Sequence, residues 1–424
     1  MLDRAAMPRR PSRRAVLKGG VLGAGALAAG VCLPRFASAA GGADGVVHIG
    51  ASLPLTGPYE KVSRICKDAF DFWTRTYDGK MVVAGRERAV KWTIYDDENN
   101  ASRAAQLTEK LISDDKVDLI VGTYGTDTVL AQGAIVRKHG HVFVQSGASS
   151  IRVDEELGGH TAFTANGRVG TYCTGAMDFL ASRTPKPKKL GLVIMDDPVY
   201  HEIGQGVKDK CAQHGIDVVT EVVLPMNVQD LRPTALKLRG AGQLDIVYNT
   251  GWDVICIKLA EEMSSIGVNP KAFVGGHLTT SPAVKDTLGP KMQGIIGSTV
   301  WLPQFKYRDE KHASAQEFAD RFKATYGYMP TYQAAFSYIL PYIYQEALRE
   351  ADPQDPFNPK TLREQLSRID LKDTIWGPVS FDGHGRIRRD SAPAVQWTGD
   401  PVAAAIVAPA DMAETAGVYP KPAW

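Results

Sequence analysis

The 424-residue sequence has few cysteines, little excess of either charge and no apolar run of membrane-spanning length. The apolar stretch from Gly20 to Pro34 is too short and too rich in glycine and alanine for a bilayer core, which needs about 20 apolar residues. Five cysteines without a C-x-x-C pair indicate neither a zinc site nor a disulfide framework. We expect buried free thiols at the four beyond residue 39: Cys66, Cys173, Cys211 and Cys256.

Motifs typical of catalysis are also missing. The sequence contains no H-E-x-x-H, no G-x-S-x-G and no P-loop, and its nine histidines show no metal-ligand spacing. His201-Glu202 lacks the second histidine of a zinc motif, and the acidic run from Asp96 to Glu98 is more typical of a turn before a helix. We therefore expect a protein that is not an enzyme and that binds no cofactor or metal.

The first 39 residues have the parts of an export signal. Paired arginines in the segment SRRAVLK, residues 12–18, precede the apolar stretch, and Ala37-Ser38-Ala39 follows it as an A-x-A cleavage pattern. The arginine segment resembles the bacterial twin-arginine signal, with Val16 in the place of phenylalanine. A general secretory signal is the alternative. We predict cleavage near Ala39 and a periplasmic protein.

Removal of residues 1–39 changes the charge balance of the chain. They hold seven of the 49 bases and one of the 47 acids, so 42 bases and 46 acids remain, a net charge of −4. Affinity for a nucleic-acid backbone depends on clustered lysine and arginine. A mildly acidic chain without a basic run is therefore not expected to bind nucleic acid.

Short apolar runs alternate with helical patterns from Val46 onward, which predicts doubly wound α/β sheets of mainly parallel strands. The first set of predicted strands covers residues 46–53, 90–97, 117–122 and 141–146. After a break at Thr164 to Arg168, a second set covers residues 188–197, 216–224, 244–251, 271–276 and 294–300. Further helices are expected after Trp301, where Pro341 should bend the helix over 332–350.

Two loops at predicted strand ends carry small residues and hydroxyl groups. The third strand runs into Gly122–Thr128, and the fourth runs into Ser146–Ser150. Doubly wound sheets bind ligands at the carboxyl ends of their strands, and backbone N–H groups at a helix start favour an anion. The loops therefore predict a carboxylate clamp, although Thr126 and Ser149 could instead only cap helices.

The order of these motifs resembles the periplasmic leucine/isoleucine/valine-binding protein family, the type I solute-binding proteins of ABC importers. The residues that carry the resemblance are Val47–Gly50, Pro54–Pro58, Tyr95–Asp97, Val121-Gly122 with Thr126, Ser146–Ser149, Asp196-Asp197 with Tyr200, Asp245–Tyr248, Gly377-Pro378 and Gln396-Trp397. The resemblance covers the whole chain after the signal. It implies two Rossmann-like lobes joined by three crossovers, which close on a ligand by a hinge.

The family pattern also implies domain limits and a function. Lobe 1 would cover residues 45–166 and 302–375, and lobe 2 would cover 167–301 and 376–424, with hinge strands at the breaks between them. The protein would be a monomeric exported receptor that captures a small carboxylate, such as a branched-chain or hydrophobic amino acid or a related organic acid. It would deliver this ligand to ABC permease subunits in the inner membrane. A ligand sensor of the same fold is the alternative.

The resemblance assigns a set of ligand-binding residues. They are Tyr124, Thr126, Gly147, Ala148, Ser149, Tyr200, Trp252 and His277. Thr126 matches a serine that binds the ligand carboxylate, Ala148 would supply backbone groups, and Ser149 matches a hydroxyl at the amino acid head. Tyr200 and Trp252 match lobe 2 aromatic residues at the cleft, although Trp252 could instead pack in the core.

The sequence departs from the family pattern at His277. Amino acid binders usually carry an acid there, which pairs with the ligand ammonium. An imidazole cannot replace that carboxylate, and a buried unpaired ammonium is costly. Asp127 or Asp253 could supply the charge, or the matching could be shifted by one or two residues. Otherwise the ligand is an aromatic acid or an amide, and Tyr124 also resembles the amide- and urea-binding members.

Overall fold

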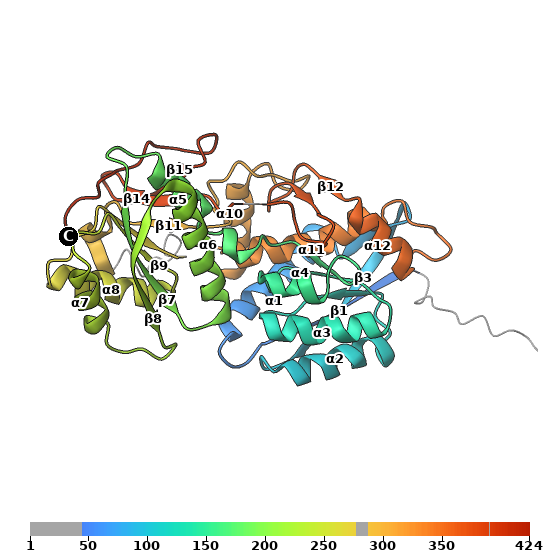
Figure 1. Ribbon diagram of the computed structural model, residues 1–424. Helices are drawn as coiled ribbons and strands as arrows, with labels where there is room; N and C mark the ends of the chain where they lie inside the picture. Colours follow the sequence, from blue (N-terminus) through green and yellow to red (C-terminus); the bar gives the residue numbers. More distant parts are fainter. Residues whose placement is uncertain (1–44, 277–286, 390) are drawn as a thin grey trace, which may run out of the picture. The chain divides into compact units, whose positions relative to one another are not determined.

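The computed structural model describes residues 45–276, 287–389 and 391–424 (Figure 1). The predicted signal segment and His277 lie outside the described residues. The described chain builds a six-stranded sheet and a seven-stranded sheet, each mainly parallel, and a small antiparallel sheet of β12 (Asp370–Leu371) and β13 (Val379–Ser380). We call the six-stranded sheet with its helices lobe 1, and the seven-stranded sheet with its helices lobe 2. The prediction of two doubly wound α/β lobes is confirmed.

Lobe 1 has the strand order β2-β3-β1-β4-β5-β6. These strands are β1 (Val46–Leu53), β2 (Lys80–Val83), β3 (Arg86–Asp96), β4 (Leu119–Val121), β5 (Phe143–Gln145) and β6 (Ala162–Thr164). β1 pairs in parallel with β3 and β4, and β2 is an antiparallel edge strand. The central strands are apolar and buried, as expected for a parallel sheet covered on both faces.

Lobe 2 has the strand order β15-β14-β11-β10-β9-β7-β8. These strands are β7 (Lys189–Met195), β8 (Asp217–Leu224), β9 (Ile246–Asn249), β10 (Ala272–Gly275), β11 (Ile296–Ser298), β14 (Ala394–Thr398) and β15 (Ala403–Ala408). β14 is antiparallel to both β11 and β15, so the late part of the chain completes this sheet. Each strand predicted from the sequence is present within a few residues of its predicted limits.

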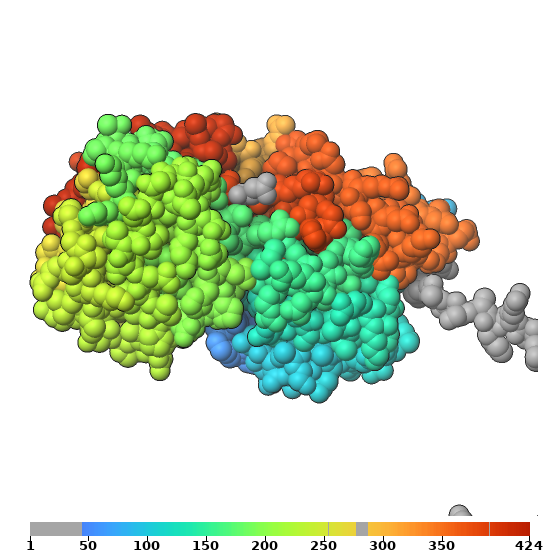
Figure 2. Space-filling model, in the orientation of Figure 1, coloured from blue at the N-terminus to red at the C-terminus, as the bar shows by residue number. Residues whose placement is uncertain are grey.

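Helices cover both sheets, and the outer surfaces of α2 and α3 are visible in Figure 2. Those of lobe 1 are α1 (Glu60–Thr76), α2 (Ala101–Ser113), α3 (Thr126–Lys138), α4 (Ile151–Glu156), α10 (Ala315–Tyr326), α11 (Tyr332–Leu348) and α12 (Pro359–Ser367). Those of lobe 2 are α5 (Thr174–Ala181), α6 (Pro198–His214), α7 (Arg232–Gly240) and α8 (Asp253–Ser265). α11 is buried along almost its whole length and contains Pro341. Its Tyr344 hydroxyl donates to Ile120 and accepts from the Val144 amide, which ties α11 to the sheet.

The chain passes between the lobes three times. The first crossover follows β6 and the second follows β11. The third lies after Ile387, beyond the end of lobe 1 that was expected at residue 375, because Gly385 and Ile387 are hydrogen-bonded to Thr164 of β6. Residues 385–387, which the prediction assigns to lobe 2, therefore lie against the sheet of lobe 1.

Two buried tryptophans and an arginine connect these crossovers. The indole of Trp301 donates to the carbonyl of Ile375 at 2.7 Å, and that of Trp376 donates to the carbonyl of Ala165 at 2.7 Å. Arg389 donates to the carbonyls of Val300 and Trp376, and its guanidinium lies over the Trp376 ring. The Ile375-Trp376 segment of lobe 1 and Arg389 therefore link the three crossovers through side chains.

The four cysteines in the described part of the chain are buried free thiols, as predicted. Burial raises the pKa of Cys66 and Cys173 to about 12, which keeps both in the unreactive thiol form. Within the described ranges, no helix is long and apolar enough to cross a membrane.

Candidate functional site

The two predicted hydroxyl-bearing loops lie in contact at the carboxyl ends of β4 and β5. Tyr124 and Gly147 form a parallel β-bridge, and the Gly125 amide donates to the Gly147 carbonyl at 3.1 Å. A Cβ atom at Gly147 would lie 2.1 Å from the Thr123 carbonyl oxygen, so only glycine permits this approach. The structure thus brings together Tyr124, Thr126, Gly147, Ala148 and Ser149 from the predicted set.

Buried side chains hold each loop in place. The Gln132 carboxamide accepts from the Thr123 amide at 3.0 Å, and the Thr123 hydroxyl donates to Asp97 at 2.5 Å. Burial raises the pKa of Asp97. In the second loop, Gln145 accepts from the Ala148 amide at 2.9 Å and donates to the Ala148 carbonyl at 3.0 Å. The backbone groups of Ala148 therefore already have partners inside the protein.

Neither of the two predicted hydroxyl ligands caps a helix. Gly125 is the N-cap of α3 and makes no side-chain cap hydrogen bond. Ser150, not Ser149, is the N-cap of α4 and accepts from the Arg152 amide. Thr126 and Ser149 are each partly exposed beside these helix starts. The capping alternative is therefore wrong, and both hydroxyls remain candidates for binding an anion.

Aromatic side chains from both lobes gather at the loops. We call them the tyrosine cluster: Tyr59, Tyr124, Tyr172, Tyr200 and Tyr332, with Trp252. The rings of Tyr59 and Tyr124 are 5.5 Å apart, and Tyr200 meets Trp252 edge to face at 5.7 Å. Trp252 is 41% exposed, so core packing, the alternative for this residue, does not describe it.

Burial sets the ionisation state of the cluster. It raises the pKa of Tyr200 far above the ordinary tyrosine value, and the neighbouring Tyr59, Asp197 and Tyr124 raise it further. Burial is also the main cause of the raised pKa of Tyr332, to which Tyr124 and Tyr200 contribute. These hydroxyls therefore stay neutral at physiological pH. The cluster provides an apolar lining with hydrogen-bonding hydroxyls and no negative charge of its own.

Tyr59, Tyr172 and Tyr332 are site residues that the sequence analysis missed. Tyr59 is the N-cap of α1, and Tyr332 begins α11 and forms a hydrogen bond with Tyr124. Both stand at helix starts, like Thr126 and Trp252. Tyr59 directly follows the Pro54–Pro58 motif, so extending that motif by one residue could have found it.

The sequence analysis proposed two carboxylates, Asp127 and Asp253, as partners for a ligand ammonium group. The Asp127 side chain is 79% exposed and pairs with Arg152 at 2.9 Å, so it already has a cation. The side chain of Asp253 and all of His277 lie outside what the structure describes. Asp197, the N-cap of α6, is instead the carboxylate whose charge reaches both Tyr59 and Tyr200.

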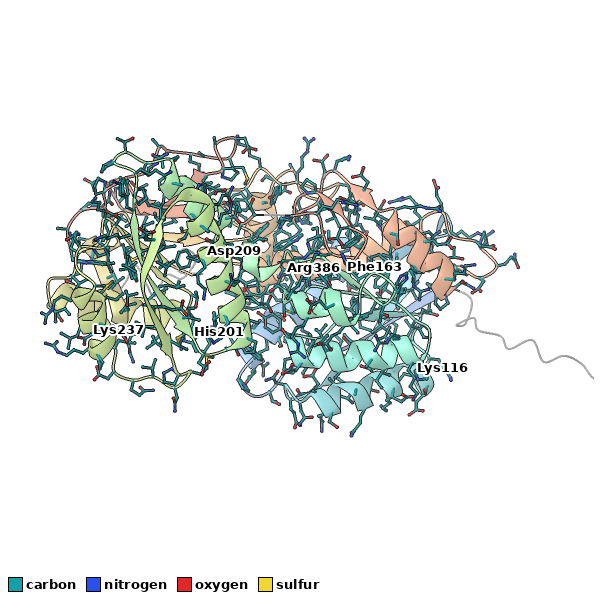
Figure 3. All side chains as sticks on the ribbon, in the orientation of Figure 1. Lys116, Phe163, His201, Asp209, Lys237 and Arg386 are labelled. Carbon is teal, nitrogen blue, oxygen red and sulfur yellow. The ribbon has the colours of Figure 1, made fainter. Side chains whose placement is uncertain are left out.

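Arg386 holds the Ser146–Ser150 loop through hydrogen bonds to its backbone carbonyls. Its side chain is fully buried and pairs with Asp154 at 2.6 Å. The guanidinium also donates to the carbonyls of Ala148 at 3.3 Å, Asn166 at 3.2 Å and Ser150 at 2.9 Å. Arg386, labelled in Figure 3, also forms a β-bridge with Thr164 of β6. One buried cation therefore holds the loop, the first crossover and the start of α4 together.

Glu202 of α6 connects lobe 2 to the start of α4 in lobe 1. Its carboxylate accepts from the Ser150 hydroxyl, and it accepts from the Ile151 amide at 3.0 Å. A carboxylate at a helix start is favoured because the amide groups there are unpaired and the helix dipole is positive. Glu202 therefore joins the lobes next to the tyrosine cluster.

Glu202→Gln should lower the free energy of unfolding by about 1 kcal/mol, because charge-assisted hydrogen bonds become neutral ones. Urea unfolding followed by circular dichroism measures this. Glu221→Gln is the matched control. Glu221 pairs with Lys208 on the surface, and such exposed ion pairs contribute little to the free energy of unfolding. Equal losses in the two variants would contradict a role for Glu202 in joining the lobes.

Two mainly parallel sheets with covering helices, joined by three crossovers, are the architecture of the type I periplasmic binding protein fold. A model of the periplasmic binding protein family matches residues 46–401, and the chain belongs to that family. It is 21% identical over 363 residues to the Leu/Ile/Val-binding protein homolog 1 of Brucella suis, covering 85% of this chain and 92% of that protein. The predicted family is therefore confirmed, and the family name implies the periplasm.

Solved structures share the fold at low identity. The branched-chain amino acid binding protein LivJ of Streptococcus pneumoniae, in complex with isoleucine, has a TM-score of 0.68 at 16% identity, over 86% of this chain and 100% of that one. A solute-binding protein of R. palustris in complex with benzoate has a TM-score of 0.68 at 18% identity, over 90% of this chain and 98% of that one. Proteins of this fold thus include both an amino acid binder and an aromatic acid binder.

Proposed function

We propose that this protein is the solute-binding receptor of an ABC importer and captures a small carboxylate with an apolar or aromatic body. The observation that carries the proposal is the contact between the Gly122–Thr128 and Ser146–Ser150 loops beneath aromatic residues of both lobes. The hydroxyls of Thr126 and Ser149, at two helix starts, would bind the carboxylate, and the tyrosine cluster would hold the body. Closure of the lobes would then present the ligand to the permease.

Two ligand classes are supported by different observations. An aromatic acid is favoured by the six aromatic side chains of the tyrosine cluster, because offset or edge-to-face ring contacts stabilise an aromatic body. A hydrophobic amino acid needs a carboxylate for its ammonium group, and Asp197 is the described candidate. A small amide is uncharged, so it would need neither a carboxylate partner for an ammonium group nor a site for an anion.

A thermal-shift screen of the purified protein tests the proposal. Aliphatic amino acids, benzoate and its hydroxylated forms, and small amides are added separately, and the true ligand should raise the melting temperature by binding only the native state. Hits are then incubated with the protein and recovered quantitatively. The proposal of a receptor fails if no carboxylate shifts the melting temperature, or if a hit is converted to product.

Replacing Thr126 or Ser149 with alanine should weaken binding of the best hit by about 1–3 kcal/mol, because each hydroxyl would donate to an anionic oxygen. Isothermal titration calorimetry measures the change. Thr325→Ala, on the exposed face of α10, is the control and should leave affinity unchanged. Unchanged affinity in both site variants would remove the carboxylate clamp.

A further inference from the structure

A separate cavity of about 830 Å³ lies beside the candidate site. It is bounded by α1, the second crossover at 301–304, the loop before α11 and β15. Of the tyrosine cluster, Tyr332 alone lines this cavity. The cavity is therefore a second chamber that shares one wall with the candidate site. Its volume lies within the range of small-molecule pockets, roughly 300–1,000 Å³.

The walls of the chamber are mainly apolar. They include Ile65, Trp301, Leu302, Met329 and Ala404. Met329 is 41% exposed, so a large apolar side chain is left partly in water. Burying such a surface against a hydrocarbon chain is favourable, at about 25 cal/mol per Å² of apolar area. The chamber thus favours a ligand with a sizeable apolar body.

The charged residues of the chamber stand on α1 and favour an anion. Lys61 and Arg64 are exposed on this helix, and Asp68 already accepts the Tyr328 hydroxyl at 2.8 Å. Arg64 pairs with Glu60, but the two side chains are 66% and 47% exposed, and such pairs are weak. The weak pairing leaves Arg64, with Lys61 three residues earlier on the same helix, as the cationic side of the chamber.

We propose that the chamber binds an amphipathic monoanion, an aliphatic carboxylate of medium chain length. Its chain lies along Ile65, Leu302 and Met329, and its carboxylate meets Lys61 and Arg64. Such a ligand contacts α1 of lobe 1, Ala404 of lobe 2 and the second crossover. Its binding is therefore thermodynamically coupled to movement of the lobes, and the coupling acts equally in both directions.

Octanoate is the probe, and octylamine is its cationic counterpart of equal chain length. Calorimetry on the purified protein should show saturable binding of one octanoate and none of octylamine. Ala404→Trp places an indole in the chamber and should abolish octanoate binding. Ala403→Trp is the matched control, since this neighbouring residue of β15 is exposed and does not line the chamber, and it should bind octanoate as the wild type does.

A charge-reversal pair tests the anion site without filling the chamber. Lys61→Glu with Arg64→Glu should weaken octanoate binding at least tenfold, whereas Lys67→Glu, on the same helix but outside the chamber, should change it less than twofold. The proposal is overturned if wild-type protein shows no saturable octanoate binding, if octylamine binds equally well, or if Ala404→Trp binds octanoate unchanged. Each of these results leaves the proposed receptor function untouched.

Discussion

Replacing Arg386 with methionine should lower the free energy of unfolding by about 3–5 kcal/mol, the usual cost of breaking a buried ion pair. Asp154 is 4% exposed and would keep Arg168 at 2.7 Å but lose its second cation. The carbonyls of Ala148, Ser150 and Asn166 would each lose the hydrogen bond that the guanidinium donates. The Ser146–Ser150 loop should then move, so ligand binding should be lost as well.

Urea unfolding, with the melting temperature as a second measure, checks this prediction. Arg388→Met is the matched control, because Arg388 is an exposed arginine two residues away and should change stability by less than about 0.5 kcal/mol. Asp154→Asn should resemble Arg386→Met, since it leaves a buried guanidinium without its carboxylate. A loss below about 1 kcal/mol in Arg386→Met would show that the cation is not needed to hold the loop.

Gly147→Ala should abolish ligand binding while the fold survives in weakened form. The added methyl group would lie 2.1 Å from the Thr123 carbonyl oxygen and 2.8 Å from the Tyr124 Cα, both of which are backbone atoms. The two loops must separate to admit it, which breaks the Tyr124–Gly147 bridge. Overpacking of this kind costs typically about 1–3 kcal/mol of stability.

Calorimetry with the best ligand from the thermal screen measures the loss of binding. Gly240→Ala is the control, because a methyl group at Gly240 meets no atom within 4 Å and the residue has no left-handed backbone. It should bind as the wild type does. Binding within threefold of wild type by Gly147→Ala would mean that the joined loops are not the ligand site.

The strands and most helices could be predicted because each depends on a local pattern. Apolar β-branched runs form the buried strands, and the helix expected over 332–350 is present as α11 (Tyr332–Leu348). α1 was missed although its buried face, with Phe70, Phe72 and Trp73, is clearly amphipathic, because its N-cap, Tyr59, makes no side-chain capping bond that would mark the start of a helix.

The sequence predicted the part of the candidate site that is formed by loops at the ends of two neighbouring strands, β4 and β5. Carboxyl ends of neighbouring parallel strands share an edge, so the two hydroxyl-bearing loops could be placed together. Tyr332 and Arg386 reach the same region from distant parts of the chain, through α11 and the segment that pairs with Thr164. No local pattern marks them, because their positions depend on how the lobes and crossovers pack.

The partly exposed position of Trp252 has a consequence for spectroscopy. Indole emission responds to the polarity around the ring, and Trp252 stands among the tyrosines at the candidate site while 41% of its surface meets solvent. Trp301 and Trp376 are almost fully buried, so their emission should change less when the site is occupied. Trp252 is therefore a built-in fluorophore, whose emission can report occupancy of the site without any attached dye.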